Sequence, residues 1–281
     1  MALALVTNDD GIESPGLLAA AKAVGAVASV IVAAPLTPQS SMGRSFPRNE
    51  GVGRIQRRNP ASFGQSCIEA FAIEGSPAQV VAYAMLELVR TPPGLCVSGI
   101  NLGENVGGTI NGSGTVGAAM EATNYGVQAL AASVQCGPGR SPNSEDWEVA
   151  SLITTRIAAL LLEHRLPRRA ELVNLNIPLG ATAETAIRQT IPTRQPYYVF
   201  ERGARVDFAS PCDLRSRIVV DMQTLEPDSD VRALLDGVVS VSLLTTHLGV
   251  MEQWAPLDSL PQREVPEGGC RSLSAARGED V

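Results

Sequence analysis

Residues 2–34 decide the fold class, and their sequence is ALALVTNDDGIESPGLLAAAKAVGAVASVIVAA. The apolar runs at 2–7 and 27–34 predict two buried strands, and residues 17–24 predict a helix between them. The turn-forming residues Asn8-Asp9-Asp10-Gly11 end the first strand. A strand, a helix and a strand in this order form a βαβ unit, so the two strands are expected to be parallel.

The alternation of strands and helices continues to residue 177. An edge strand is expected at 68–73, because its side chains alternate in polarity. The other predicted elements are strands at 95–98, 129–134 and 172–177 and helices at 78–90, 115–125 and 145–164. A long loop that can include one hairpin arm is expected at 39–64, and a loop is expected at 99–112, because glycine and polar residues dominate both segments. The sequence therefore predicts an α/β domain built on a parallel sheet.

After residue 180 the pattern changes to short alternating segments between turns rich in proline and glycine. Hairpins are expected there, with strands at 218–222 and 238–244. Residues 264–281 have the composition of a disordered tail. We expect an α/β core over 1–180, a region of strands and a hairpin arm over 181–260 that partly returns to the core, and a tail over 261–281.

The composition excludes several classes of protein. With a net charge of -7 and no run of basic residues, the chain is not expected to bind nucleic acid. No apolar run is long enough to cross a membrane or to form a signal sequence, so a cytoplasmic location is expected. The five cysteines lack CxxC spacing, which predicts reduced thiols. The two histidines, His164 and His247, exclude a His-cluster zinc site and weaken a Ser-His-Asp triad.

Asp9 and Asp10 directly follow the first predicted strand. Ligands of open parallel sheets bind outside the carboxyl ends of the strands, so both carboxylates are well placed for function. Two adjacent carboxylates repel each other unless a cation or hydrogen-bond donors neutralise them, and their oxygens suit a hard divalent cation. A solvated Asp-Asp-Gly turn explains this segment equally well when it is considered alone.

Two further loops supply oxygen donors. Ser40 and Ser41 follow the second strand, and Arg44 in the same loop could contact an anion. Asn101 and Asn105 follow strand 95–98, and an asparagine carbonyl is a neutral ligand for Mg²⁺ or Mn²⁺. An ordinary turn and a flexible connector are the alternatives for these two loops.

Residues 112–117, Gly-Ser-Gly-Thr-Val-Gly, lead into the predicted helix 115–125. The free amides of a helix N-terminus, with the hydroxyls of Ser113 and Thr115, are typical of a phosphate site, although Ser113 can equally be a simple helix cap. The same letters match the GxGxxG dinucleotide fingerprint. We reject that interpretation because the motif begins about a dozen residues after its strand and Gln135 stands near the place of the acidic ribose partner.

All of these segments fall on one edge of the predicted sheet. Together they offer acids, hydroxyls, an amide oxygen and a helix N-terminus, but no lysine or histidine nucleophile. Metal-assisted hydrolysis of a phosphate ester is the reaction that these groups serve best. Tyr197, Tyr198 and Phe200 can stack on a base, but packing within a hairpin is the more common role of such residues.

A resemblance to the SurE (survival protein E) family of metal-dependent 5'-nucleotidases is carried by the strings LVTNDDGIESPGL, VSGINLGENVG and SGTVGAAMEATNYG. Weaker similarity in EGSPAQVV, LVNLNIP and GVVSVSLL extends the likeness over residues 1–250. The resemblance implies a Rossmann-like three-layer core with a C-terminal hairpin arm that joins subunits into a homodimer or homotetramer. It also implies hydrolysis of nucleoside 5'-monophosphates and, in some members, of 3'-monophosphates and short polyphosphate.

The resemblance further implies one divalent cation per subunit, Mg²⁺ or Mn²⁺. Its ligands are expected to be Asp9, Asp10, Ser40 and Asn101. The expected catalytic residues are Asp9, Asn101 and Ser113, and Asp9 is the better candidate to orient or deprotonate the attacking water. Contacts to the substrate phosphate are expected from Asn8, Ser41, Asn105, Ser113, Gly114 and Thr115.

This chain departs from the family pattern around the substrate pocket. Ser-Met-Gly-Arg-Ser at 41–45 stands where Gly-x-Ser-x-Ser is usual. Gly108 and Thr109 replace an acidic or bulky pair, and Gly112 replaces a tyrosine or histidine. The metal ligands are intact, so the resemblance implies that catalysis survives these changes.

Two rival interpretations differ in chemistry. A haloacid-dehalogenase-type phosphatase uses an aspartate nucleophile within Asp-x-Asp, whereas Asp9 and Asp10 are adjacent. A nucleotide-binding regulator would keep the fold without turnover. A trapped phosphoaspartyl intermediate would identify the first, and the absence of metal-dependent phosphate release would identify the second.

Overall fold

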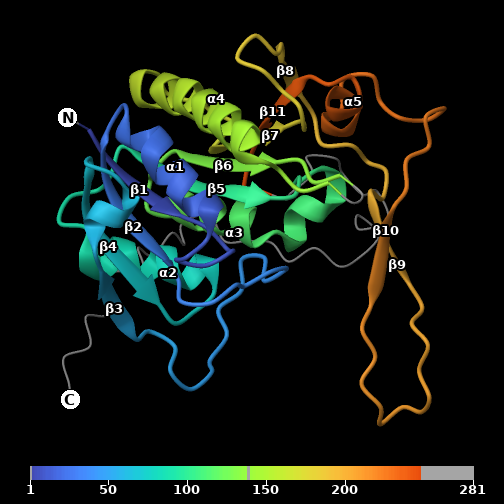
Figure 1. Ribbon diagram of the computed structural model, residues 1–281, viewed down its shortest axis with the longest axis horizontal. Coiled ribbons are helices and arrows are strands. Elements are labelled where there is room, and N and C mark those ends of the chain that lie inside the picture. Colours follow the sequence, from blue (N-terminus) through green and yellow to red (C-terminus); the bar gives the residue numbers. More distant parts are fainter. Residues whose placement is uncertain (1, 138–139, 248–281) are drawn as a thin grey trace, which may run out of the picture. The chain divides into compact units, whose positions relative to one another are not determined.

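A nine-stranded sheet organises the protein in the computed structural model, which describes residues 2–137 and 140–247 (Figure 1). The strand order is β3-β4-β2-β1-β5-β6-β7-β11-β8. In chain order these strands are β1 Leu3–Thr7, β2 Ser29–Pro35, β3 Ile55–Arg58, β4 Cys67–Ile73, β5 Leu95–Leu102, β6 Ala129–Val134, β7 Leu172–Ile177, β8 Ile187–Thr190 and β11 Val239–Leu244. Strands β9 Tyr198–Glu201 and β10 Arg215–Ile218 form a separate antiparallel pair, which we call the arm together with its connecting loop.

Helices cover both faces of the sheet (Figure 1). They are α1 Pro15–Gly25, α2 Pro77–Tyr83, α3 Gly114–Thr123, α4 Ser144–Glu163 and α5 Asp230–Leu235, with 3₁₀ turns η1 Pro60–Phe63 and η3 Gly107–Gly112 and a π-helical turn η2 Ala84–Leu88. Helices α1 and α4 pack with one face of the sheet, and α2 and α3 pack with the other. Among the described residues, no helix is both long and apolar enough to cross a bilayer.

The predicted α/β class and its parallel core are confirmed. Strand β1 pairs in parallel with β2 on one side and with β5 on the other. After β1 the chain adds β2, β3 and β4 on one side of it and then crosses to add β5 on the other side, so the carboxyl end of β1 lies where the strand order switches. Crevices at such switch points are where open α/β sheets bind ligands.

The helix starts follow from the sequence. The side chains of Ser14, Ser76, Ser113 and Asn143 each accept a hydrogen bond from a backbone amide in the first turn of α1, α2, α3 and α4, respectively. Such caps satisfy amides that have no partner within the helix and stabilise it by about 1 kcal/mol each. The cap at Ser113 fixes where α3 begins.

The edge of the sheet differs from the prediction, which made strand 68–73 an edge strand. Strand β3 lies within 39–64, where a long loop with one hairpin arm was expected, and pairs antiparallel with β4, so β4 is flanked on both sides. The sequence of β3 is IQRR, whose mostly exposed polar side chains carry no apolar alternation. A strand held mainly by backbone pairing leaves no such pattern in the sequence.

Strand β5 is longer than predicted. It continues from Ser98 to Leu102, because pairing with β6 resumes at Asn101 after a register shift. Asn101 is therefore held in a strand rather than in the expected loop at 99–112. A side chain fixed by a strand is better placed to serve a site than one in a flexible connector.

The predicted hairpins after residue 180 are partly wrong. Strand β11 does not form a hairpin but enters the main sheet between β7 and β8. Of the strand expected at 218–222 only Ile218 belongs to β10, as its last residue, and the Val219 amide donates to the Tyr197 carbonyl just beyond it. The end of the predicted C-terminal region, 248–260, and the predicted tail at 261–281 lie outside the described residues.

Candidate active site

A pocket of about 760 Å³ lies where the loops after β1, β2 and β5 meet the arm. It also includes Pro196 and Tyr197, which directly precede β9 and which we call the root of the arm. Its wall consists of Asp9, Asp10, Ser40, Ser41, Asn101, Leu102, Glu104, Asn105, Gly108, Thr109, Gly112, Ser113, Pro196, Tyr197, Tyr198, Phe200 and Ser216. Segments far apart in the sequence are thus brought to one cavity by the parallel order of the strands.

The turn after β1 is fixed from within by Asn8. The Asn8 amide donates to the Gly11 carbonyl at 3.1 Å and to the Ser14 hydroxyl at 2.7 Å, and its Oδ1 accepts from the Gly11 amide at 3.2 Å. Asn8 is fully buried and is not part of the pocket wall. Its side chain therefore shapes the turn that carries the two carboxylates.

The same turn is joined to the loop after β2. The Gln39 amide donates to the Asp9 carbonyl at 2.7 Å, and the Ile12 amide donates to the Pro35 carbonyl at 2.8 Å. These two bonds set the start of the loop against the acidic turn. Ser40, the next residue, consequently shares the pocket wall with Asp9.

Asp9 is a buried carboxylate with one strong donor. The Thr115 hydroxyl donates to Asp9 Oδ1 at 2.6 Å from the first turn of α3. The pKa of Asp9 is raised to about 6, chiefly by burial and also by the charge of Asp10, while the bond from Thr115 opposes the rise. The pKa remains raised because one hydroxyl does not replace the lost hydration of a buried charge.

Asp10 and Asn101 meet the pocket from neighbouring strands. The Leu102 amide donates to Asp10 Oδ2 at 3.4 Å, and burial raises the pKa of Asp10 above its ordinary value. The Asn101 side-chain amide donates to the Gly103 carbonyl at 2.6 Å. This bond uses the nitrogen of Asn101, so its Oδ1 is the atom available as a neutral oxygen ligand.

Two glycines let α3 approach the acidic turn and the serine loop. A Cβ on Gly114 would lie 2.7 Å from the Asp9 Cβ and 2.9 Å from Asp9 Oδ2. A Cβ on Gly117 would collide with the backbone of Gly43 in the loop that follows Ser41. Gly114 and Gly117 of the GxGxxG letters thus permit close packing of the chain on itself.

Ser113 lies at the N-cap of α3 and lines the pocket. Its hydroxyl oxygen accepts from the Val116 amide at 3.1 Å, which leaves the hydroxyl hydrogen available as a donor. Thr115, in contrast, is fully buried and its hydroxyl is used by Asp9. Among the hydroxyls of α3, Ser113 is therefore the one at the pocket wall.

Asn105 is anchored by side chains of β6 and β7. Its side-chain amide donates to the Ser133 hydroxyl at 2.9 Å, and its backbone amide donates to Asn176 Oδ1 at 2.8 Å. Its carbonyl accepts from the amides of Asn174 at 2.8 Å and Asn176 at 3.0 Å. A polar platform beneath the loop therefore fixes Asn105 while its side chain reaches the pocket wall.

The pocket wall is negatively charged. It includes the carboxylates of Asp9, Asp10 and Glu104, and no lysine, arginine or histidine is among its described residues. Arg44, a predicted anion contact, does not reach the wall, because its guanidinium pairs with Glu121 Oε2 at 2.8 Å. An anion can bind here only if a cation offsets these charges.

The donors at the pocket wall suit a hard cation. Asp9, Asp10, Ser40 and Asn101 offer two carboxylates, a hydroxyl and an amide carbonyl, all of them oxygen ligands. Within residues 2–137 and 140–247, no group of three or more His, Cys, Asp or Glu side chains could hold a metal. A cation at this pocket would therefore need the neutral oxygens of Ser40 and Asn101 as well as the two aspartates.

The predicted site residues fall into two groups. Those at the pocket wall are Asp9, Asp10, Ser40, Ser41, Asn101, Asn105 and Ser113, and those behind it are Asn8, Gly114 and Thr115. Sequence reasoning overlooked Glu104 and favoured a packing role for Tyr197, Tyr198 and Phe200, which line the pocket from the arm. Two features of the sequence could have identified these residues: Glu104 is an acid in the glycine-rich run after β5, and Tyr197 and Tyr198 are adjacent aromatic residues.

Comparison with known proteins identifies related chains. The family model described as "Survival protein SurE" matches residues 4–200. A 5'-nucleotidase SurE of Methanocella arvoryzae is 38% identical over 200 residues, which cover 69% of this chain and 73% of the relative. A 5'-nucleotidase SurE of Methanosarcina acetivorans is 34% identical over 252 residues, which cover 85% of this chain and 90% of the relative. The crystal structure of the SurE protein from Aquifex aeolicus superposes with a TM-score of 0.71 at 27% identity. The superposition covers 88% of this chain and 94% of that structure.

The contact between Gly114 and Asp9 leads to a prediction for Gly114→Ala. The added methyl group would force Asp9 and α3 apart, so we expect the free energy of unfolding to fall by about 1–3 kcal/mol, as for other overpacked sites. Gly112→Ala is the matched control, because its Cβ would meet nothing within 4 Å. Urea denaturation of both variants measures the difference, and equal stability of the two would contradict the contact.

Proposed function

The chain belongs to the survival protein SurE family, and from that premise we propose that its pocket hydrolyses nucleoside 5'-monophosphates to nucleoside and phosphate with the aid of a divalent cation. The observation that carries the proposal is the pairing of an acidic, oxygen-rich wall with a helix N-terminus at the switch point of the sheet. The relatives in Methanocella arvoryzae and Methanosarcina acetivorans, which are named 5'-nucleotidases, support the same reaction.

We assign one Mg²⁺ or Mn²⁺ per subunit to Asp9, Asp10, Ser40 and Asn101, the four oxygen donors that share the wall. When bound, such a cation polarises the phosphoryl oxygens and makes a water molecule more acidic. Thr115 holds Asp9 in one orientation, and Leu102 holds Asp10, so both carboxylates are preorganised before any ligand arrives. Preorganised ligands avoid the cost of ordering these side chains on binding.

The reaction needs an attacking water, a held phosphate and a leaving oxygen. Asp9 orients or deprotonates the water, whose oxygen forms a bond to phosphorus as the bond to the 5'-oxygen breaks. The 5'-oxygen takes up a proton from solvent and leaves as the hydroxyl of the nucleoside. Ser113 donates its hydroxyl hydrogen to the charge that develops on the phosphoryl oxygens. Asn101, Ser41 and Asn105 also line the wall, and we assign to them contacts with the phosphate group or its cation.

The residues behind the wall have a supporting role in this proposal. Asn8 shapes the turn, Gly114 permits the close approach of α3, and Thr115 binds Asp9. We therefore replace the phosphate contacts predicted for them by indirect support of the carboxylates.

The open space around Gly108 and Gly112 is compatible with 3'-monophosphates and short polyphosphate, which we include as further substrates of the same site.

A phosphate-release assay tests the proposed reaction. AMP and GMP should be hydrolysed with Mg²⁺ or Mn²⁺ and not with a chelator present. Asp9→Asn should abolish turnover, and Ser113→Ala should lower kcat by roughly ten- to a thousandfold, in line with the loss of one donor to a developing oxyanion. Asp228→Asn, an exposed aspartate away from the pocket, is the matched control. Nucleotide binding without phosphate release from the wild-type protein would favour a regulator and overturn the proposal.

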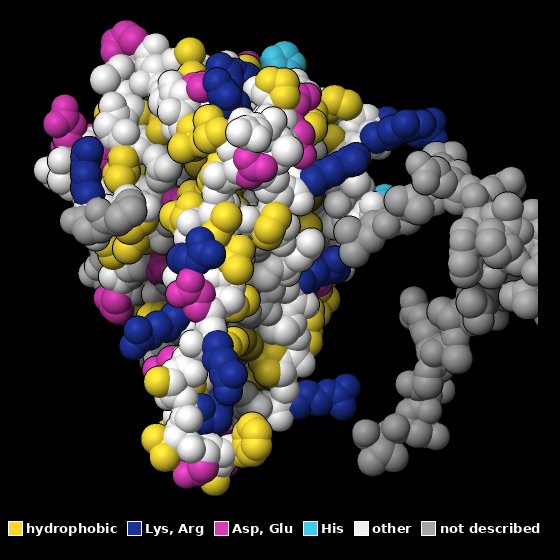
Figure 2. Space-filling model, turned by 90° about the vertical axis from the view of Figure 1, so that its right-hand side faces the viewer, with side chains coloured by type: hydrophobic (Ala, Val, Ile, Leu, Met, Phe, Trp, Pro, Cys, Tyr) yellow, Lys and Arg dark blue, Asp and Glu magenta, His cyan; other side chains and the backbone are white. Residues whose placement is uncertain are grey.

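We also propose that the arm joins copies of this chain into a homodimer or homotetramer. Its loop exposes large apolar side chains, with Val206 at 92% and Phe208 at 100% exposure. Figure 2 shows hydrophobic and basic side chains interspersed on the side of the molecule that carries the arm. Large apolar side chains exposed to this extent are typical of a surface that is covered in an assembly.

The arm proposal predicts a change of mass in solution. The double variant Val206→Ser and Phe208→Ser should shift the protein from an oligomer to a smaller species in light scattering. Phe46→Ser, which removes an apolar side chain 50% exposed outside the arm, should leave the mass unchanged. A monomeric wild-type protein at micromolar concentration would contradict the proposal.

A further inference from the structure

Glu104 connects three parts of the chain at the pocket wall. It follows β5, is only 3% exposed, and is one of the wall residues. Its Oε1 accepts the hydroxyls of Tyr197 at 2.7 Å and Tyr198 at 3.0 Å, and its Oε2 accepts the backbone amide of Cys136 at 3.1 Å. One buried carboxylate therefore ties the end of β5 to the end of β6 and to the root of the arm.

The two tyrosines are arranged by this carboxylate. Their rings lie edge to face, with centroids 4.9 Å apart and planes at 77°. Tyr197 is buried in an apolar cluster with Val106 and Leu225, whereas Tyr198 is half-buried at the pocket wall. Burial and the negative charge of Glu104 raise the pKa of both hydroxyls far above the ordinary value, so both remain donors at neutral pH.

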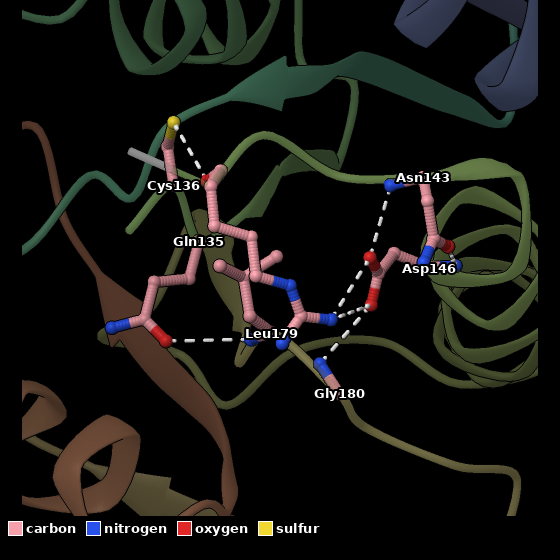
Figure 3. Close-up of polar contacts among 7 residues, drawn as sticks. Gln135, Cys136, Asn143, Asp146, Leu179 and Gly180 are labelled. Carbon is pink, nitrogen blue, oxygen red and sulfur yellow. Dashed lines mark hydrogen bonds and ion pairs between the residues drawn. The ribbon is translucent and has the colours of Figure 1, made fainter. Parts of the chain in front are cut away.

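The third donor to Glu104 lies in a well-anchored segment. Gln135, the residue before Cys136, accepts the Leu179 amide on its Oε1 at 3.3 Å (Figure 3). Asp146, at the start of α4, accepts from the amides of Asn143 at 3.0 Å and Gly180 at 3.1 Å in the same view. The ends of β6 and β7 are thereby fixed to each other and to α4, so the Cys136 amide presents a stable donor.

The phosphate and the nucleoside of the substrate are expected to contact different parts of the pocket wall. If the phosphate lies with the cation ligands, the nucleoside extends to the rest of the wall, which includes Pro196, Tyr198, Phe200 and Ser216 of the arm and its root. Aromatic side chains stack on nucleobases with little dependence on the base. The position of the arm root then determines how well the nucleoside is held.

We propose that Glu104 is a positioning residue for substrate recognition, which fixes Tyr197 and Tyr198 so that the arm root binds the nucleoside end of the substrate. This inference rests on the proposed function. It assigns no part of the phosphate chemistry to Glu104, because the hydrogen bonds of its carboxylate go to the arm and to β6. Without Glu104 the two tyrosines would have to be ordered each time the substrate binds.

A comparison of two substrates tests the inference. Glu104→Leu removes all acceptors, so the KM for AMP should rise roughly five- to a hundredfold, the cost of ordering two side chains on binding. Glycerol phosphate lacks a nucleoside, so its KM should stay within about twofold of wild type. The kcat for both substrates should also stay within about twofold, since only binding of the nucleoside is lost. Glu104→Gln, whose carbonyl can still accept both tyrosine hydroxyls, should restore much of the affinity for AMP.

Two further variants separate recognition from stability and charge. Tyr197→Phe with Tyr198→Phe leaves Glu104 in place but removes both hydroxyl donors, and it should raise the KM for AMP alone; this pair also tests the inference should Glu104→Leu fail to fold. Glu226→Gln is the control, because Glu226 accepts the Thr193 hydroxyl at 2.6 Å near the arm root but is not part of the pocket wall. It should leave the KM of both substrates unchanged.

The outcomes distinguish the inference from the function on which it rests. A wild-type protein that hydrolyses neither substrate would overturn the proposed function, and the inference with it. Hydrolysis of both by the wild type, with the KM of both rising equally in Glu104→Leu and in the double tyrosine variant, would overturn the inference alone. An unchanged KM for AMP in these variants would also overturn it.

Discussion

The rest of the structure depends on two negative charges held side by side at the carboxyl end of β1. Burial raises the pKa of both Asp9 and Asp10, and the charge of Asp10 adds to the rise at Asp9. Buried carboxylates require donors or a counter-ion, because burial removes their hydration. The Thr115 hydroxyl and the Leu102 amide provide only part of this compensation. In the function that we propose, a cation supplies the remainder and makes the acidic pocket able to accept a phosphate.

Three segments of the chain converge on that pair. Strand β1 lies between β2 and β5, so the loops that follow all three strands open at one edge. Short side chains allow the convergence: Gly114 admits α3 to Asp9, and Gly117 admits it to the loop that follows Ser41. Glu104 then joins this centre to the arm, so a single cavity contains both the acidic wall and the aromatic surface to which we assign the nucleoside.

The sequence predicted the parts of the protein that leave a local pattern. Apolar runs located β1, β2, β6 and β7, and the parallel βαβ rule placed the acids, serines and asparagines at one edge. Strand β3 is short and polar, so the sequence indicated a hairpin arm within 39–64 but not its position. Strand β11 was assigned to a hairpin because its partner β7 is more than sixty residues away. The bond from Thr115 to Asp9 and the role of Glu104 depend on contacts between distant segments, which no local pattern records.

Calorimetric titration of Mn²⁺ into the metal-free protein at pH 7 and pH 5 tests the central claim most directly. The account predicts one site per chain, abolished in Asp10→Asn. Its affinity should be about tenfold weaker at pH 5 than at pH 7, because a carboxyl with a pKa of about 6 is mostly protonated at pH 5 and the proton must leave before the cation binds. Equal affinity at both pH values, or unchanged affinity in Asp10→Asn, would contradict the claim that this aspartate pair holds the cation.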